Sequence, residues 1–216
     1  MSKIKACIFD LDGVIVDTAV YHYKAWRRLA NQLGFDFTEE QNEELKGISR
    51  IESLKIILNW GRVTKSAEEM EELATLKNTW YVDMITKMTP DEILPGAKEF
   101  LELVRSKNYL TALGSASKNS ETILNQIGLI NLFDALVDGN KVTKSKPNPE
   151  VFLVGAKELN VLPEECVVFE DAIAGVQAAK NGNMKTVGIG KADVLTEADI
   201  VVGGLNEMTI EKLENL

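Results

Sequence analysis

The chain has 216 residues, of which 45% are hydrophobic and 26% charged, and its formal net charge is -9. This length accommodates one sizeable core with a modest inserted domain, and the composition is ordinary for a folded globular protein. The acidic balance argues against a nucleic-acid partner, and no apolar run approaches the ~20 residues of a membrane-spanning helix.

The predicted elements begin with an apolar strand that ends on two acids, in the segment IFDLDGV at residues 8–14. Three later apolar segments also break into polar residues before a helix, at residues 110–115, 167–170 and 185–189. This alternation of strand and helix predicts a parallel sheet. Helical periodicity places helices between and after the strands, at residues 96–107, 119–127, 150–159, 172–181 and 208–215.

Residues 17–89 interrupt this alternation, because they contain four or five helix-like stretches and no convincing strand. Pro90 and the pair Pro95-Gly96 mark the return to the α/β pattern. The sequence therefore predicts an α/β core at residues 1–16 and 90–216, built on a Rossmann-like parallel sheet. The inserted residues 17–89 are predicted to form an α-helical cap domain.

Polar residues follow the predicted strands at the edge where open parallel sheets bind ligands. They are Asp10 and Asp12 after the first strand, Ser115 and Ser117 after the second, Lys146 in the segment KSKPNPE, and Glu170 with Asp171 after CVVF. Carboxylates gathered at one edge would repel one another unless a cation lay among them, and an all-oxygen site suits Mg²⁺. Lys146 and Ser115 could hold a phosphoryl group beside that metal.

These residue types together predict phosphoryl transfer. One carboxylate would attack and form an aspartyl phosphate, while a second acid at the same strand end would carry the proton. Residues two apart in an extended strand face the same side, so Asp10 and Asp12 can address one phosphoryl group, and Gly13 lets the chain turn away. An Asp-x-Asp-Gly segment alone would indicate only a turn with a helix cap, but the ordered set of residues favours the catalytic interpretation.

The segments DLDGV, GSAS, KPNPE and FEDA resemble the four motifs of the haloacid dehalogenase superfamily, and the resemblance spans essentially the whole chain. It implies that Asp10 is the nucleophile, Asp12 the general acid/base, and Ser115 and Lys146 the phosphoryl binders. It also implies that Mg²⁺ is held by Asp10, the backbone carbonyl of Asp12, and Asp171, with Glu170 close by. Ala172 departs from the expected pattern, because a serine is expected after the Glu-Asp pair.

Three places in the helical segment carry residues that have both a structural and a functional interpretation. Ser49 and Glu52 predict a capping box, and Arg50 lies in the first turn of that helix, where it could bind a phosphate. His22 lies on an apolar helix stripe. It is interpreted either as a packing residue or as a group that reaches the catalytic acid. Lys77 also lies on an apolar stripe, and it either snorkels to solvent or points into the cleft.

The segments DTAVYHYKAW, LKGISRIESL, LKNTWYV and SASKN are similar to those of phosphomutases in this superfamily. The similarity implies interconversion of β-glucose 1-phosphate and glucose 6-phosphate, with β-glucose 1,6-bisphosphate as the activating intermediate. It implies that Arg50, Lys118 and Asn119 bind the distal phosphate. It further implies that Gly47 and Ser49 lie close to the sugar, and that His22, Lys77 and Thr18 help to place Asp12 when the cap closes. The remaining substrate-binding residues that it implies are Lys46, Ala116 and Ser117.

Two other interpretations stay open on the sequence alone. A hydrolase of the same fold would use the same core motifs on a sugar phosphate or phosphoglycolate, and only the cap residues favour a substrate that is held at both ends. A non-catalytic relative would keep the fold without the reaction. We expect a cytoplasmic monomer that acts on a small sugar phosphate and has no nucleic-acid or membrane partner.

Overall fold

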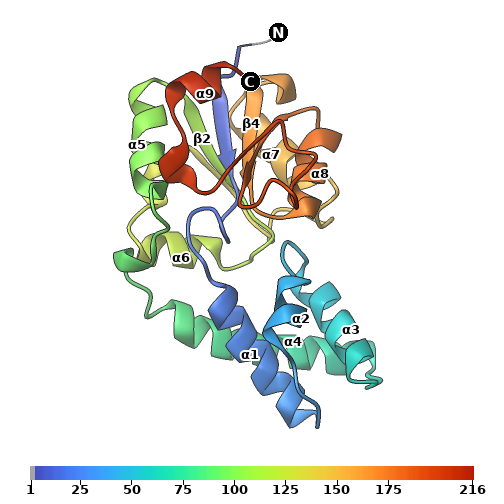
Figure 1. Cartoon of the computed structure of the whole chain (residues 1–216). Helices are drawn as coiled ribbons and strands as arrows, with labels where there is room; N and C mark the ends of the chain where they lie inside the picture. Colours follow the sequence, from blue (N-terminus) through green and yellow to red (C-terminus); the bar gives the residue numbers. More distant parts are fainter. Residues whose placement is uncertain (1–2) are drawn as a thin grey trace.

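The computed structural model describes residues 3–216, and it contains a six-stranded parallel sheet with helices on both faces and a group of helices at one end (Figure 1). The strands are β1 (Ala6–Phe9), β2 (Leu110–Gly114), β3 (Ala135–Val137), β4 (Cys166–Glu170), β5 (Lys185–Ile189) and β6 (Ile200–Val202). They lie in the order β3-β2-β1-β4-β5-β6, and each neighbouring pair is parallel. The predicted α/β class with a Rossmann-like sheet is confirmed.

The helices that accompany the sheet are α5 (Ala97–Ser106), α6 (Ser120–Gln126), α7 (Glu150–Glu158), α8 (Ile173–Asn181) and α9 (Ile210–Glu214). Short 3-10 turns lie at Pro90–Glu92, Ile130–Leu132, Pro163–Glu165 and Leu205–Glu207. Each of these five helices lies inside its predicted range. Strands β3 and β6 were not predicted, because three apolar residues at the side of a sheet carry too little periodicity to be recognised.

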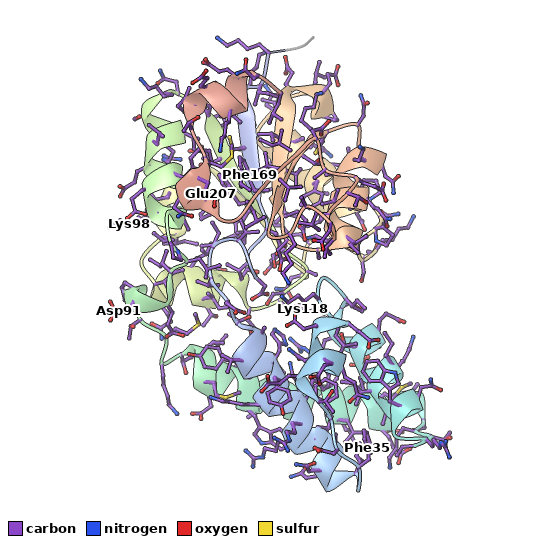
Figure 2. All side chains as sticks on the ribbon, viewed as in Figure 1. Phe35, Asp91, Lys98, Lys118, Phe169 and Glu207 are labelled. Atoms are coloured by element: carbon purple, nitrogen blue, oxygen red, sulfur yellow. The ribbon has the colours of Figure 1, made fainter. Side chains whose placement is uncertain are left out.

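Burial of the sheet on both faces explains the apolar run at the start of the chain. All four residues of β1 are buried. Cys7 and Phe9 face the hydrophobic cluster that includes side chains of α5, α6 and α9, whereas Ala6 and Ile8 face the opposite cluster with α7 and α8. Successive residues of a strand point to opposite faces, so a strand covered on both sides needs apolar residues at every position. The Phe9 ring also stacks on Phe169 of β4, which Figure 2 places inside the sheet region.

Four further helices lie between β1 and β2 and pack around a hydrophobic cluster of their own. They are α1 (Ala19–Gln32), α2 (Glu39–Glu43), α3 (Arg50–Trp60) and α4 (Ala67–Ile85). Helices α2, α3 and α4 each begin with an N-cap, supplied by Thr38, Ser49 and Ser66 respectively. Each of these side chains accepts a hydrogen bond from a backbone N–H of the first turn. We call residues 17–89 the cap; these exact boundaries stay a prediction.

The cap lies at the end of the sheet where the chain leaves β1 (Figure 1). Figure 2 labels Lys118 at the junction of the two parts and Phe35 at the far end of the cap. Within residues 3–216, no helix combines the length and the apolar character that crossing a bilayer requires.

Candidate active site

The strand order places the catalytic candidates at one crevice. From β1, the sheet grows toward β2 and β3 on one side and toward β4, β5 and β6 on the other. The carboxyl ends of β1 and β4 therefore border the position where an open parallel sheet binds ligands. Asp10 directly follows β1, Glu170 ends β4, and the backbone N–H of Asp10 donates to the carbonyl of Phe169 at 2.9 Å. This bond extends the ladder by one residue and fixes the backbone of Asp10 beside Glu170.

Lys146 lies between the two buried carboxylates at this edge. Its Nζ is 2.5 Å from Oδ1 of Asp10 and 2.9 Å from Oε2 of Glu170, and its side chain is 1% exposed. Burial alone would lower the pKa of Lys146, but the charges of Asp10 and Glu170 raise it above its ordinary value. Lys146 is therefore a fixed cation whose position suits it to neutralise a phosphoryl oxygen on Asp10.

Asp10, Glu170 and Asp171 form a cluster that can hold a divalent cation. Each offers a carboxylate oxygen, and these oxygens lie within 4.8 Å of one another. Burial, and then the charge of Asp10, raise the pKa of Asp171 to about 7 and also raise the pKa of Glu170. Three carboxylates beside one lysine leave excess negative charge, and oxygen-only ligands fit Mg²⁺. The predicted fourth ligand, the backbone carbonyl of Asp12, stays a prediction.

Asp12 occupies a different environment from Asp10. Its Oδ1 accepts a hydrogen bond from the hydroxyl of Thr18. Burial, followed by the charge of Asp10, raises the pKa of Asp12 to about 6. A carboxyl group with a pKa this close to neutrality can both give and take a proton at physiological pH. The geometry therefore supports different roles for the two acids, with Asp10 beside the cation cluster and Asp12 as the proton carrier.

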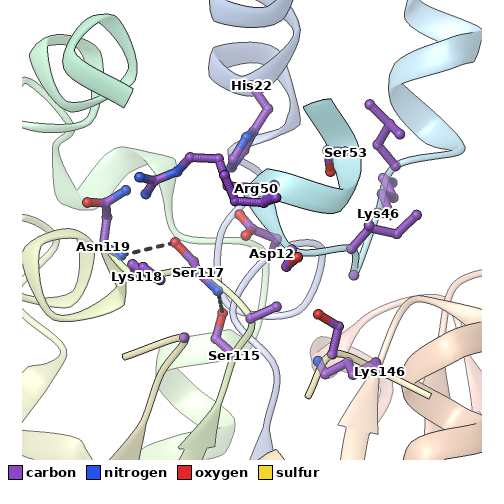
Figure 3. A pocket seen from close by; sticks show the side chains of 18 of the residues that line it. Asp12, His22, Lys46, Arg50, Ser53, Ser115, Ser117, Lys118, Asn119 and Lys146 are labelled. Carbon is purple, nitrogen blue, oxygen red and sulfur yellow. Dashed lines mark hydrogen bonds between the residues drawn. The ribbon is translucent and has the colours of Figure 1, made fainter. Parts of the chain in front are cut away.

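A cavity of about 360 Å³ lies between the strand ends and the cap. Its walls include most of the residues predicted from the sequence (Figure 3). From the core these are Asp10, Asp12, Ser115, Ala116, Ser117, Lys118, Asn119, Lys146 and Asp171, and from the cap His22, Lys46, Gly47, Ser49, Arg50 and Lys77. Thr18 and Glu170 do not line the cavity, because Thr18 is fully buried behind Asp12 and Glu170 lies behind Lys146.

The cap side chains resolve two interpretations that the sequence left open. Lys77 is 1% exposed and lines the cavity, so of its two interpretations the structure favours the one in which it points into the cleft over the one in which it snorkels to solvent. Its Nζ lies 2.8 Å from Nδ1 of His22 and over the rings of Trp26 and Tyr81. Burial, and then the nearby cations, lower the pKa of both His22 and Lys77. His22 therefore belongs to a polar group inside the cap rather than to its apolar packing alone.

Arg50 begins α3 at the cavity wall, and Figure 3 shows its side chain extended toward Asn119. The Ser49 hydroxyl accepts from the backbone N–H of Glu52, so the predicted N-cap is confirmed. The reciprocal bond of a capping box is not formed, because the Glu52 carboxylate pairs with Lys55 at 2.6 Å instead. A guanidinium and an open helix N-terminus at one place can bind an anion.

The loop after β2 is shaped by its own hydroxyl groups. The backbone N–H of Ser117 donates to Oγ of Ser115 at 3.1 Å, and the N–H of Asn119 donates to Oγ of Ser117 at 3.2 Å (Figure 3). The Asn119 side-chain amide donates to Oδ1 of Asn78 on α4 at 3.0 Å. This bond joins the core loop to the cap. Asn78 was not singled out from the sequence, although it directly follows Lys77.

Gly13 allows the chain to pass close to the carboxylate cluster. Its φ of +77° is in the left-handed region, and a Cβ there would lie 2.0 Å from Oδ2 of Asp171. Gly13→Ala should therefore displace the Asp171 carboxylate and weaken Mg²⁺ binding about 10–100-fold, as measured by titration calorimetry.

Gly128→Ala provides the matched control for the change at Gly13. Gly128 has a φ of +75°, but a Cβ there would meet nothing within 4 Å. This control should lose about 1 kcal/mol of stability from backbone strain and keep its Mg²⁺ affinity. Equal Mg²⁺ affinities in the two variants would contradict the role given to Gly13.

Comparison with known proteins identifies the family. The family model of haloacid dehalogenase-like hydrolases matches residues 7–189. The chain belongs to this family. It is 43% identical over 212 residues to the β-phosphoglucomutase of Bacillus subtilis, and this alignment covers 97% of this chain and 94% of that protein. It is also 33% identical over 186 residues to a phosphorylated carbohydrates phosphatase of Thermotoga maritima, over 85% of this chain and 84% of that protein.

The fold of this haloacid dehalogenase-like protein matches a solved structure over nearly its full length. The crystal structure of β-phosphoglucomutase from Clostridium difficile superposes with a TM-score of 0.94 at 46% identity, covering 98% of this chain and 97% of that one. The resemblance to the superfamily that was inferred from the four core motifs is confirmed.

Proposed function

We propose that this protein is a phosphomutase that interconverts β-glucose 1-phosphate and glucose 6-phosphate. The observation that carries the proposal is a cavity with reactive carboxylates at one end and a second anion-binding group at the other. Asp10 and Asp12 lie at the strand ends, whereas Arg50 extends from the cap toward Asn119 (Figure 3). A substrate with a phosphate at each end needs both sites. The similarity to the β-phosphoglucomutases of Bacillus subtilis and Clostridium difficile supports the same reaction.

In the first half-reaction, phospho-Asp10 transfers its phosphoryl group to the 6-hydroxyl of β-glucose 1-phosphate. The bond between phosphorus and Asp10 breaks, a bond from phosphorus to O6 forms, and Asp12 takes the hydroxyl proton. Lys146 and Ser115 hold the phosphoryl oxygens. Asp10, Glu170 and Asp171 would hold Mg²⁺, which when bound neutralises charge on the transferring group.

In the second half-reaction, the product β-glucose 1,6-bisphosphate turns around and presents its C1 phosphate to Asp10. The Asp10 carboxylate attacks phosphorus, the bond to O1 breaks, and Asp12 returns the proton to O1. Glucose 6-phosphate leaves, and phospho-Asp10 is regenerated. Throughout, Arg50, Lys118 and Asn119 bind whichever phosphate is not reacting. The sugar is contacted by Lys46, Gly47, Ser49, Ala116 and Ser117, while Thr18, His22 and Lys77 help to place Asp12.

Core and cap residues of a single chain line the cavity. We therefore extend the proposal to a monomer in which the cap closes over the core and excludes water from phospho-Asp10. A phosphatase acting on a sugar phosphate is the second candidate. The similarity to the phosphorylated carbohydrates phosphatase of Thermotoga maritima supports that candidate.

Incubation with Mg²⁺, β-glucose 1-phosphate and a trace of glucose 1,6-bisphosphate tests the proposal, with products followed by phosphorus NMR and the α anomer as control. A mutase should convert the β anomer to glucose 6-phosphate with little inorganic phosphate. Release of mainly inorganic phosphate would identify the phosphatase instead.

Arg50→Ala separates the two candidates independently. A mutase must hold the intermediate by its distal phosphate, so kcat/KM should fall at least about 100-fold, equivalent to losing a charge-assisted pair of about 3 kcal/mol. Arg27→Ala is the matched control, because Arg27 is exposed on the outer face of α1 and pairs with Asp36. An Arg50→Ala enzyme with wild-type kcat/KM would rule out a distal phosphate site at this residue.

A further inference from the structure

Thr18 stands at the start of α1 in the position of an N-cap, yet its hydroxyl makes no cap hydrogen bond. Thr18 is fully buried, and its hydroxyl donates to Oδ1 of Asp12. The Thr18 hydroxyl oxygen in turn accepts a hydrogen bond from the hydroxyl of Tyr81 at 3.1 Å. A threonine at an N-cap normally stabilises the helix. Here the Thr18 hydroxyl instead takes part in two hydrogen bonds that run from Tyr81 through Thr18 to Asp12, the proposed catalytic acid.

Tyr81 connects this chain to the inside of the cap. It lies on α4, is 1% exposed, and lines the cavity. Its ring centroid lies 4.2 Å from that of His22, and the Nζ of Lys77 lies 4.7 Å from the ring. Burial, and then the charge of Asp12, raise the pKa of Tyr81, so its phenol keeps the proton that it donates to the Thr18 oxygen.

The direction of the two bonds has a specific consequence. A threonine hydroxyl has one proton and can rotate to donate it to several partners. Tyr81 donates to the Thr18 oxygen, and the ionised Asp12 carboxylate can only accept, so the Thr18 proton is directed toward Asp12. Each of the two bonds polarises the other. The orientation of Asp12 therefore depends on a residue of the cap helix α4, although Asp12 itself belongs to the core.

We propose that Tyr81 is a positioning residue that sets the orientation of Asp12 through Thr18. Tyr81 thereby couples the position of α4 relative to the core to proton transfer by Asp12. This inference rests on the proposed function, because it assumes that Asp12 moves the proton of the sugar oxygen. Tyr81 does not touch the reacting atoms. Its effect should therefore be confined to reactions in which the oxygen that leaves or attacks needs a proton.

Two phosphoryl donors with different leaving groups make this distinction. When Asp10 attacks acetyl phosphate, the bond between phosphorus and the acetate oxygen breaks, and acetate leaves as a stable anion without a proton. When Asp10 attacks a sugar phosphate, the leaving sugar oxygen must take a proton from Asp12. The ratio of the two rates thus reports the efficiency of Asp12 and is insensitive to general damage at Asp10.

Tyr81→Phe removes the phenol and keeps the ring that packs against His22 and Lys77. We expect kcat with β-glucose 1-phosphate to fall about 10–100-fold, the size of a small misplacement of a catalytic group, with KM changed less than about twofold. Phosphorylation of Asp10 by acetyl phosphate should proceed at the wild-type rate. Tyr109→Phe is the matched control, because Tyr109 is also buried but its hydroxyl lies near Glu214 in the core, and both rates should be unchanged.

Thr18→Val provides a second variant that leaves Tyr81 intact. If Tyr81 acts through Thr18, adding Tyr81→Phe to Thr18→Val should cause no further loss of kcat, whereas independent effects would multiply. Three results would each overturn the inference. They are kcat losses of Tyr81→Phe and Thr18→Val that multiply in the double variant, equal rate losses of Tyr81→Phe with acetyl phosphate and with the sugar phosphate, and a wild-type kcat for Tyr81→Phe. If the wild-type protein hydrolyses β-glucose 1-phosphate without forming glucose 6-phosphate, the proposed function fails, and the same rate ratio measured on that hydrolysis still tests Tyr81.

Discussion

Asp10→Asn should reduce kcat for conversion of β-glucose 1-phosphate at least about 10⁴-fold, the scale seen when a covalent nucleophile is removed. The amide keeps the shape of the side chain but cannot attack phosphorus, so no phosphoenzyme forms. Lys146 also keeps a hydrogen-bond acceptor, which limits disturbance of the buried pair. The measurement is steady-state production of glucose 6-phosphate, together with mass spectrometry of the protein after exposure to acetyl phosphate.

Asp91→Asn removes the same charge at an exposed position of the turn at Pro90–Glu92 and serves as the control. It should keep wild-type kcat and still acquire one phosphate from acetyl phosphate. A phosphate adduct on the Asp10→Asn protein, or retention of more than a few per cent of kcat, would assign the nucleophile to another residue.

The core of the site could be predicted from the sequence because its residues follow a rule that depends on strand ends alone. A buried parallel strand reads as an apolar run, and the first polar residues after it must lie at the ligand-binding edge. Asp10, Ser115 and Glu170 were found in this way, and the structure places Asp10 and Glu170 within reach of Lys146. No comparable rule fixes Lys146 itself, which lies in a loop and was recognised from its Pro-rich surroundings.

The cap residues could be predicted only in part, because their roles depend on how α1 packs against α4. His22 and Lys77 each had a structural and a functional interpretation until their 2.8 Å contact placed both inside the cap. Tyr81 lies on the same helix stripe as Lys77 and resembles a packing residue in any periodicity analysis. Its hydroxyl gains a role only through Thr18, which is distant in sequence. The bond between Asn78 and Asn119 likewise exists only once the two parts meet.

Local signals also failed where a side chain had two possible partners. Ser49 and Glu52 fit the sequence pattern of a capping box, and the forward bond is formed. The Glu52 carboxylate nevertheless binds Lys55, three residues further along the exposed face of α3. Both arrangements satisfy Glu52, and the sequence pattern alone does not rank them. The functional prediction for Arg50 was unaffected, since it depends on the open start of α3 and not on the reciprocal bond.

Lys146→Met should have the second large effect, because it removes the only cation that contacts the Asp10 and Glu170 carboxylates among the residues that the structure describes. Breaking a buried ion pair by deleting one partner leaves uncompensated charge, which typically costs about 3–5 kcal/mol. We therefore expect the free energy of unfolding in urea, measured without Mg²⁺, to fall by that amount. Phosphoryl transfer should also be abolished, since the phosphoryl group loses a fixed positive partner.

Lys141→Met is the matched control, because Lys141 pairs with Glu158 at 2.9 Å on the surface. A solvent-exposed pair contributes about 0–1 kcal/mol, so this variant should be nearly as stable as the wild type. Mg²⁺ gives a second, independent readout. A cation bound by Asp10, Glu170 and Asp171 would offset the charge left by Lys146→Met, so Mg²⁺ should raise the melting temperature of this variant more than that of the wild type. Equal stabilisation of the two proteins by Mg²⁺ would show that Lys146 and the metal do not compensate the same carboxylates.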